Sequence, residues 1–157
     1  MKRYYYIVFF LVIILAACRK DTSVDVTVMP QETTTGENTF GCIIDSWIYV
    51  GGRYRDYGTE SIVFKFNGSD KMDVEVKVLG LNEPYAYIAF TIINLHDLPR
   101  CEFINARWLD RLIGNKDGEP LGSGTVKITR FDKEANIISG RFSGGKIAHG
   151  QFDVKYR

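Results

Sequence analysis

Alternation of apolar and polar residues is the feature that most constrains how this chain can fold. It is clearest in residues 72–78, where four apolar side chains alternate with two acids and a lysine. Successive side chains of a β-strand point to opposite faces, so this pattern is typical of a strand with one buried face. Downstream of Asn38, no window longer than about ten residues has the apolar spacing of an amphipathic helix. The folded part is therefore predicted to be mostly β.

Eight or nine short segments carry strand signals and are separated by turn residues. A hairpin with one solvent-exposed face is predicted for residues 62–66 and 72–78, which are joined by a turn at residues 67–70. Residues 85–95 are apolar on both faces, which is typical of a central strand. The other expected strands are residues 40–44, 47–50, 101–104, 125–131, 138–142 and 146–156, with a bulge near Gly150 because Ile147 is out of phase with its neighbours.

The backbone groups at the edges of so many short strands must be paired or covered, and this requirement limits the possible architectures. We favour an all-β fold, an antiparallel two-layer β-sandwich of about eight to nine strands, over the alternative of a partly open barrel. One short helix is considered near residues 106–113, since Asn105 could cap it and Gly114 could end it. Residues 38–157 are expected to form a single β domain.

The first 18 residues predict where the protein works. Lys2 and Arg3 precede an apolar run that closes on Leu-Ala-Ala-Cys at residues 15–18. This is the pattern of a bacterial lipoprotein signal, in which residues 1–17 are removed and the thiol of Cys18 receives lipid. The alternatives are an ordinary secretory signal and a transmembrane anchor, which would need about 20 apolar residues. Two or three acyl chains, palmitate among them, would hold the protein to its membrane.

Residues 18–37 are predicted to be a lipidated flexible tether. They are rich in threonine and poor in large apolar side chains, so they bury little surface to offset their ordering entropy. Nineteen residues after Cys18 would reach at most about 60 Å. Cleavage removes two of the 20 basic side chains and none of the 19 acidic ones, which leaves a nearly neutral chain. No nucleic-acid partner is implied.

Two cysteines remain in the predicted domain, Cys42 and Cys101. An even number of cysteines in an oxidising compartment permits a disulfide between them. The alternative is two buried thiols. Neither cysteine has the closely spaced cysteine or histidine partners that a zinc site requires.

Four short stretches of the chain carry a family resemblance. They are NTFGC at residues 38–42, GTVKITRFD at 124–132, IISGRF at 137–142 and GQFDVKY at 150–156. Together they resemble a family of small lipoproteins of unknown function that is common in Bacteroidetes. The resemblance implies placement in the outer membrane, on a face that it does not specify. It carries no known activity, so no catalytic residue follows from it.

Catalytic residue types are few. The chain has two histidines, His96 and His149, and Asp97 follows the first. The strained Gly-x-Ser-x-Gly turn of a serine hydrolase is missing from the sequence. Residues 115–119 weakly resemble a calcium loop, but they are too few for a full ligand set and are better explained as a turn. No metal or cofactor is expected.

The best candidate for ligand binding is the loop at residues 51–58, which is bracketed by glycines. Its rings, Tyr54 and Tyr57, could stack on sugars while Arg53 and Arg55 bind hydroxyl groups. The alternative is a solvated loop whose tyrosines lie back on the sheet. Two functions from different classes therefore remain open. The favoured one is a non-enzymatic binding or accessory module for a glycan, peptide or envelope partner, and the alternative is a small hydrolase that uses His96 or His149.

Overall fold

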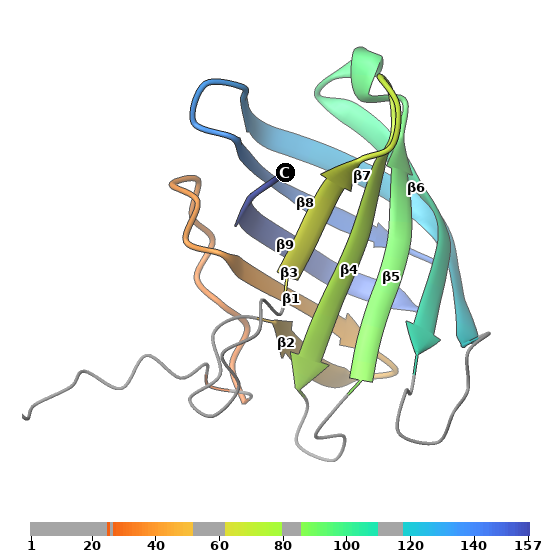
Figure 1. The fold of residues 1–157 in the computed structure, drawn as a ribbon. Helices are drawn as coiled ribbons and strands as arrows, with labels where there is room; N and C mark the ends of the chain where they lie inside the picture. The colour runs from red at the N-terminus through yellow and green to blue at the C-terminus, as the bar shows by residue number, and fades with distance from the viewer. Residues whose placement is uncertain (1–24, 26, 52–61, 80–85, 110–117) are drawn as a thin grey trace, which may run out of the picture.

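The structure is a computed structural model that describes residues 25, 27–51, 62–79, 86–109 and 118–157. Within these residues the chain forms nine β-strands and one short 3-10 helix (Figure 1). The elements are β1 (Thr39–Ile44), β2 (Trp47–Gly51), β3 (Ile62–Phe66), β4 (Met72–Leu79), β5 (Ala86–Ile93), η1 (Leu95–Asp97), β6 (Arg100–Leu109), β7 (Glu119–Asp132), β8 (Ile137–Gly144) and β9 (Ile147–Lys155).

All nine strands belong to one antiparallel sheet. Strands β3 to β9 are neighbours in chain order, and β1 and β2 follow beyond β9. Val50 and Gly51 of β2 also pair with the end of β4, which closes eight strands into a barrel-like sheet. Strand β3 pairs with the rest of the same edge of β4. The prediction of an all-β antiparallel domain of eight or nine strands is confirmed, and the pairing gives it the barrel-like arrangement.

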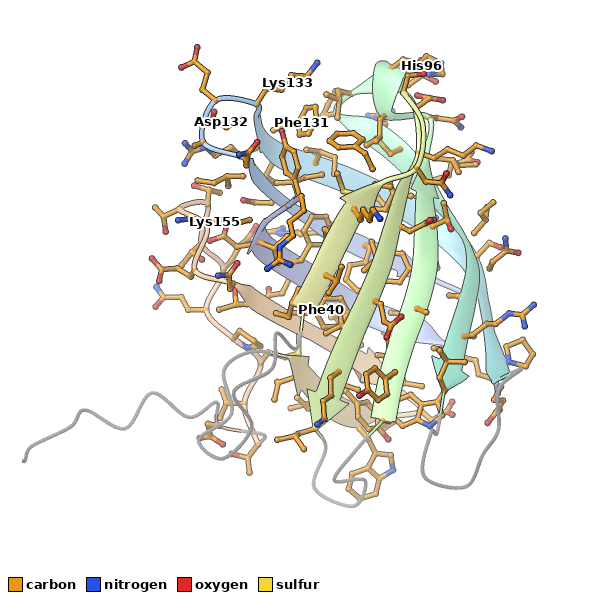
Figure 2. The ribbon with its side chains drawn as sticks, in the orientation of Figure 1. Phe40, His96, Phe131, Asp132, Lys133 and Lys155 are labelled. Carbon is orange, nitrogen blue, oxygen red and sulfur yellow. The ribbon has the colours of Figure 1, made fainter. Side chains whose placement is uncertain are left out.

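Aromatic rings fill the middle of this barrel. Phe142 of β8 contacts the rings of Phe40, Phe90, Phe103 and Phe152, with centroids 5.3 to 6.1 Å apart. Figure 2 labels one of these rings, Phe40. Alternate residues of each strand supply the inward side chains, as the period of two predicts. An eight-stranded barrel is just wide enough for side chains to fill, so these rings form a packed core.

The end of β6 corrects one prediction. The short helix considered near residues 106–113 is wrong in its described part, because Ala106 to Leu109 continue strand β6. Trp108 pairs with Ile88 of β5 on one side and with Glu119 of β7 on the other. Pairing with two neighbours outweighs local helical spacing, and Asn105, expected as a helix cap, instead takes a left-handed conformation at an irregularity in the strand.

The cysteines take the second of the two alternatives considered. Cys42 and Cys101 are both buried and both carry free thiols. Burial raises the pKa of the Cys42 thiol well above its ordinary value, and it raises the pKa of Cys101 in the same direction. Buried thiols with raised pKa values are poor nucleophiles, so these two cysteines act as small core side chains.

Candidate functional site

The N-terminal part of the described chain lies on the outside of the barrel. Residues 29–37, which we call the strap, pass along β9 before the chain turns into β1 (Figure 1). The Gln151 side-chain amide donates to the carbonyl of Pro30, and the Arg130 guanidinium donates to the carbonyl of Thr34 over 2.5 Å. A Cβ on Gly41 would lie 2.5 Å from the Pro30 ring, so glycine permits this close approach. Part of the predicted tether thus contacts the barrel.

Asp153 of β9 is the centre of that contact. It lies between two inward residues and therefore points outward, yet it is only 1% exposed. Its carboxylate accepts hydrogen bonds from the Thr33 hydroxyl at 2.6 Å and the Ser139 hydroxyl at 2.6 Å. The backbone N–H groups of residues 35–37 donate to it over 2.9 to 3.1 Å. Short polar groups, rather than apolar area, therefore attach the strap.

The pKa of Asp153 follows from two opposing effects. Burial raises the pKa, whereas hydrogen bonds from Ser139, Thr33 and the backbone of residues 36 and 37 lower it, and the net direction is downward. Asp153 therefore stays ionised at neutral pH, and its hydrogen bonds are charge-assisted. Such bonds are roughly twice as strong as neutral ones, which suits a segment with little apolar surface.

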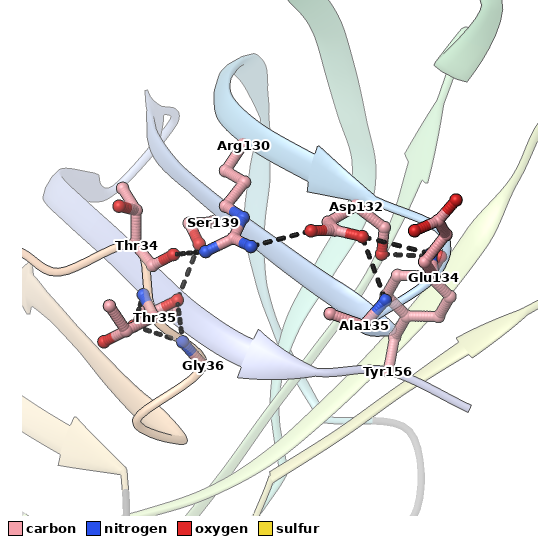
Figure 3. A network of polar contacts seen from close by, with 10 residues as sticks. Thr34, Thr35, Gly36, Arg130, Asp132, Glu134, Ala135, Ser139 and Tyr156 are labelled. Carbon is pink, nitrogen blue, oxygen red and sulfur yellow. Dashed lines mark hydrogen bonds and ion pairs between the residues drawn. The ribbon is translucent and has the colours of Figure 1, made fainter.

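A second carboxylate continues this network (Figure 3). Asp132, the last residue of β7, accepts backbone hydrogen bonds from Glu134 and Ala135 in the turn to β8, at 3.0 and 2.9 Å. Asp132 also forms an ion pair with Arg130 at 2.7 Å. Arg130 is the residue that donates to the carbonyl of Thr34 in the strap. The turn, the strap and β7 are thereby held together by one guanidinium.

A groove of about 570 Å³ lies beside the strap, on the outer faces of β7, β8 and β9. The strap contributes Glu32, whose carboxylate receives two hydrogen bonds from Arg141, one of them Nε to Oε1 at 2.8 Å. This pair lowers the pKa of Glu32 and raises that of Arg141. The Arg141 side chain is 64% exposed, so solvent screens the pair. The polar residues of the groove are Glu32, Thr125, Lys127, Arg141, Ser143, His149 and Gln151.

A bulge in β9 places His149 in this groove. The registers with β1 and with β8 both shift between residues 147 and 151, and His149 has a left-handed φ of 46°. The predicted bulge near Gly150 is thus confirmed. A Cβ on Gly150 would lie 2.5 Å from the Phe142 ring, so the bulge packs directly on the core. Bulges redirect side chains, and this one turns the imidazole to the surface.

A second, smaller groove of about 350 Å³ crosses the outer faces of β3 to β6. Its charged residues are Lys65, Asp73 and Glu75. Asp73 accepts hydrogen bonds from the side chains of Asn67 and Thr91, both at 2.8 Å. Neighbouring side chains therefore already occupy its central carboxylate, and the groove beside the strap is the better site.

The two histidines lie in different places. His96 is in η1, at the upper end in Figure 2, while His149 lies on β9. His96 Nδ1 is 2.7 Å from Asp70, and His96 Nε2 is 3.4 Å from Asp97. The pKa of His96 is raised, mainly because of its hydrogen bond to Asp70. The side-chain partners of His96 are thus two carboxylates, and neither is a nucleophile of the hydroxyl or thiol type. Among the described residues, no group of three His, Cys, Asp or Glu could hold a metal ion.

Several predicted site residues lie outside the described residues. They are the lipidation site Cys18 and the candidate ligand-binding residues Arg53, Tyr54, Arg55 and Tyr57. The predictions for them stay predictions. Sequence analysis missed Asp153, Glu32 and Arg141. A charged residue on the outward side of a strand, or in a segment without regular structure, is expected to be solvated unless the contact between the strap and the barrel is known.

The fold and the groove define a small antiparallel β-barrel with a ring-filled interior and a polar groove on its outside. No protein-family model, curated protein or solved structure matches the chain. Over the described part of the chain, the structure contains no helix of the length and apolarity that crossing a membrane requires.

Proposed function

We propose that this protein is a lipid-anchored binding module of the bacterial outer membrane, and that it binds an acidic glycan in the groove beside the strap. The observation that carries the proposal is the composition of that groove. Lys127, Arg141 and His149 gather around a space of about 570 Å³, with Glu32 as its acid. Ligand sites have volumes of about 300 to 1,000 Å³ and use a few polar groups to orient the ligand.

The chemistry of the lining favours a sugar with acidic groups. Arg141 presents a planar guanidinium that matches a carboxylate, and it already binds one in this way, from Glu32. The hydroxyl groups of Thr125 and Ser143 and the amide of Gln151 add neutral donors and acceptors of the kind that pair with sugar hydroxyls. A negatively charged ligand would compete with Glu32 for Arg141.

The location rests on the sequence. The lipoprotein signal ending at Cys18 supports the anchor, and the resemblance to small Bacteroidetes lipoproteins supports the outer membrane. Replacement of Cys18 by alanine should leave an uncleaved, unlipidated precursor. Metabolic labelling with palmitate tests this, and label in the alanine variant would contradict the anchor.

The binding role is favoured over the alternative of a small hydrolase. His96 and His149 are both exposed, and they lie on separate elements. A catalytic histidine of a hydrolase needs a positioned nucleophile beside it, and the side-chain partners of His96 are the carboxylates of Asp70 and Asp97. These observations support a module that binds without chemistry.

A glycan array with neutral and uronic-acid-containing glycans tests the ligand class. We expect binding to the acidic glycans, and loss of at least about tenfold in affinity in Arg141→Ala, as removal of a charge-assisted bidentate contact implies. Lys71→Ala is the matched control, because Lys71 is an exposed cation in the turn between β3 and β4, away from the groove. Equal binding of neutral and acidic glycans, or an unchanged Arg141→Ala variant, would contradict the proposal.

A further inference from the structure

We propose that the end of the barrel with the turn between β1 and β2 faces the membrane, and that Trp47 contacts the lipid interface there. The inference rests on the proposed lipid anchor at Cys18 and adds the orientation of the domain. Three observations carry it: the direction of the strap, the exposure of Trp47 and the distribution of charge between the two ends of the barrel.

The strap runs in the same direction as β9. Its contacts advance from Gln151, which bonds Pro30, to Asp153, which bonds residues 33–37, and Gly36 lies against Lys155. Residues 27 and 28 therefore lie toward the end where β9 begins, which is where Ile147 pairs with Ile44 beside the turn between β1 and β2. Figure 1 draws the orange start of the described chain level with the lower ends of β4 and β5.

This arrangement shortens the free part of the tether. Only nine residues lie between Cys18 and Val28, and the ten Cα–Cα steps that join these two span at most about 35 Å when extended. The lipid would thus be held near this end of the barrel, whereas an unattached tether of 19 residues could reach about 60 Å and would impose no orientation.

Trp47 is presented rigidly at the same end. Asp45 and Ser46 both have left-handed φ angles, 48° and 71°, and join the pair Ile44 and Trp47 in a two-residue hairpin turn. The Trp47 side chain is 49% exposed. Tryptophan is enriched at membrane interfaces because its ring is apolar and its N–H can bind water or headgroups. Val28, which is 58% exposed, adds a second apolar side chain on the strap's approach to this end.

Over the described residues, the opposite end of the barrel carries an excess of acidic side chains, which disfavours a lipid surface with anionic headgroups. Four acidic side chains lie there beside two lysines, Lys71 and Lys133, and His96. Among the described residues at the end with Trp47, the charged side chains include Lys146 and Glu119, which pair at 2.5 Å, and the exposed Asp45. The acids at the opposite end are Asp70, Asp97, Asp132 and Glu134.

Tryptophan fluorescence tests the orientation. The chain has two tryptophans, and Trp108 is half-buried against Tyr49, with ring centroids 4.7 Å apart. The lipidated protein would be reconstituted in vesicles of phosphatidylethanolamine and phosphatidylglycerol with brominated acyl chains, which quench nearby rings. We expect the protein to lose about half of its emission, because one ring reaches the lipid. Trp47→Phe, which keeps only Trp108, should lose a clearly smaller fraction of its emission.

The outcomes separate the anchor from the orientation. If the chain carries no lipid and does not float with the vesicles, the anchor fails and the inference fails with it. If the chain floats but its emission is not quenched, the orientation alone is overturned. The Asp153→Asn variant should float with the vesicles and remain folded by circular dichroism. Its tryptophan emission should nevertheless be quenched less, because a released strap no longer holds the Trp47 end of the barrel toward the membrane. Unchanged quenching in that variant would overturn the role of the strap.

Discussion

Two neighbouring residues on opposite faces of strand β9 are buried to a similar extent by different means. Phe152, on the inner face, is 3% exposed and packs among the rings of Phe64 and Phe142. Asp153, the next residue, is 1% exposed and is surrounded by five hydrogen-bond donors. Other side chains exclude water from Phe152, whereas the strap, mostly through its backbone, excludes water from Asp153.

The difference between the faces is one of tolerance. Apolar contact has no preferred direction, so a ring core tolerates a side chain of similar volume at modest cost, whereas deletion of a ring leaves a cavity. A buried carboxylate keeps its charge only while donors satisfy its oxygen atoms, so its environment depends on geometry. Equal burial therefore predicts different responses to mutation, and four experiments examine this.

The largest effect is expected inside the barrel. Phe142→Ala should lower the free energy of unfolding by about 4 kcal/mol, because it removes a ring that four others contact and leaves a cavity. Chemical denaturation measures the change. Phe131→Ala is the control, since Phe131 is only half-buried and should lose less. A loss no larger than that of the control would mean that the rings do not form the central core.

Asp153→Ala should have the next largest effect, about 3 kcal/mol, since hydrogen bonds to a charged group contribute about 1.5 to 3 kcal/mol each but the strap can regain water once released. Hydrogen exchange distinguishes it from the core variant. The amides of residues 35–37 should exchange rapidly while those of β8 stay protected. Ser139→Ala, which removes one donor, should leave these amides slow. Slow exchange in Asp153→Ala would contradict the attachment.

Acid should weaken the same contact. The pKa of Asp153 is lowered in the folded chain, so its stabilising contribution is present above the ordinary aspartate pKa of about 4 and is lost as the pH falls through the lowered value. Glu32, Asp70 and Asp132 also have lowered pKa values and act in the same direction. The difference between wild type and Asp153→Asn, followed by denaturation from about pH 7 to pH 2, isolates Asp153. A difference that does not narrow on acidification would contradict the assigned ionisation.

The inner face was predictable from the sequence and the outer one was not. Apolar alternation in residues 72–78 marks a buried face without reference to any distant residue, and the bulge at Gly150 follows from a local break in phase. The donors to Asp153 are mostly backbone N–H groups, which every residue has, and they lie 116 to 118 residues away in the chain. Sequence patterns carry no record of such a contact.

The groove was hidden for a related reason. Lys127 pairs with Arg141, and Arg141 pairs with Gln151, so three exposed side chains become neighbours only when the strand registers are known. Each of them alone is an ordinary outward residue of a strand. The loop at residues 51–58 was favoured as the ligand-binding site because its tyrosines and arginines are adjacent in the sequence. The residues of the groove come from three strands and become neighbours only in the folded sheet.

The smallest effect on stability is expected at the ion pair between the strap and the barrel, formed by Glu32 and Arg141. This pair joins the strap to the barrel as Asp153 does, but its side chains are 35% and 64% exposed, so water and salt screen it. Glu32→Gln should leave the midpoint of denaturation unchanged within error. Binding of polygalacturonate should nevertheless become several-fold tighter, because the variant removes the carboxylate that competes for Arg141. If the midpoint falls as far as in Asp153→Ala, the exposed pair also attaches the strap, and burial would not separate the two kinds of contact. If the midpoint is unchanged but binding weakens, Glu32 contacts the ligand instead of competing with it.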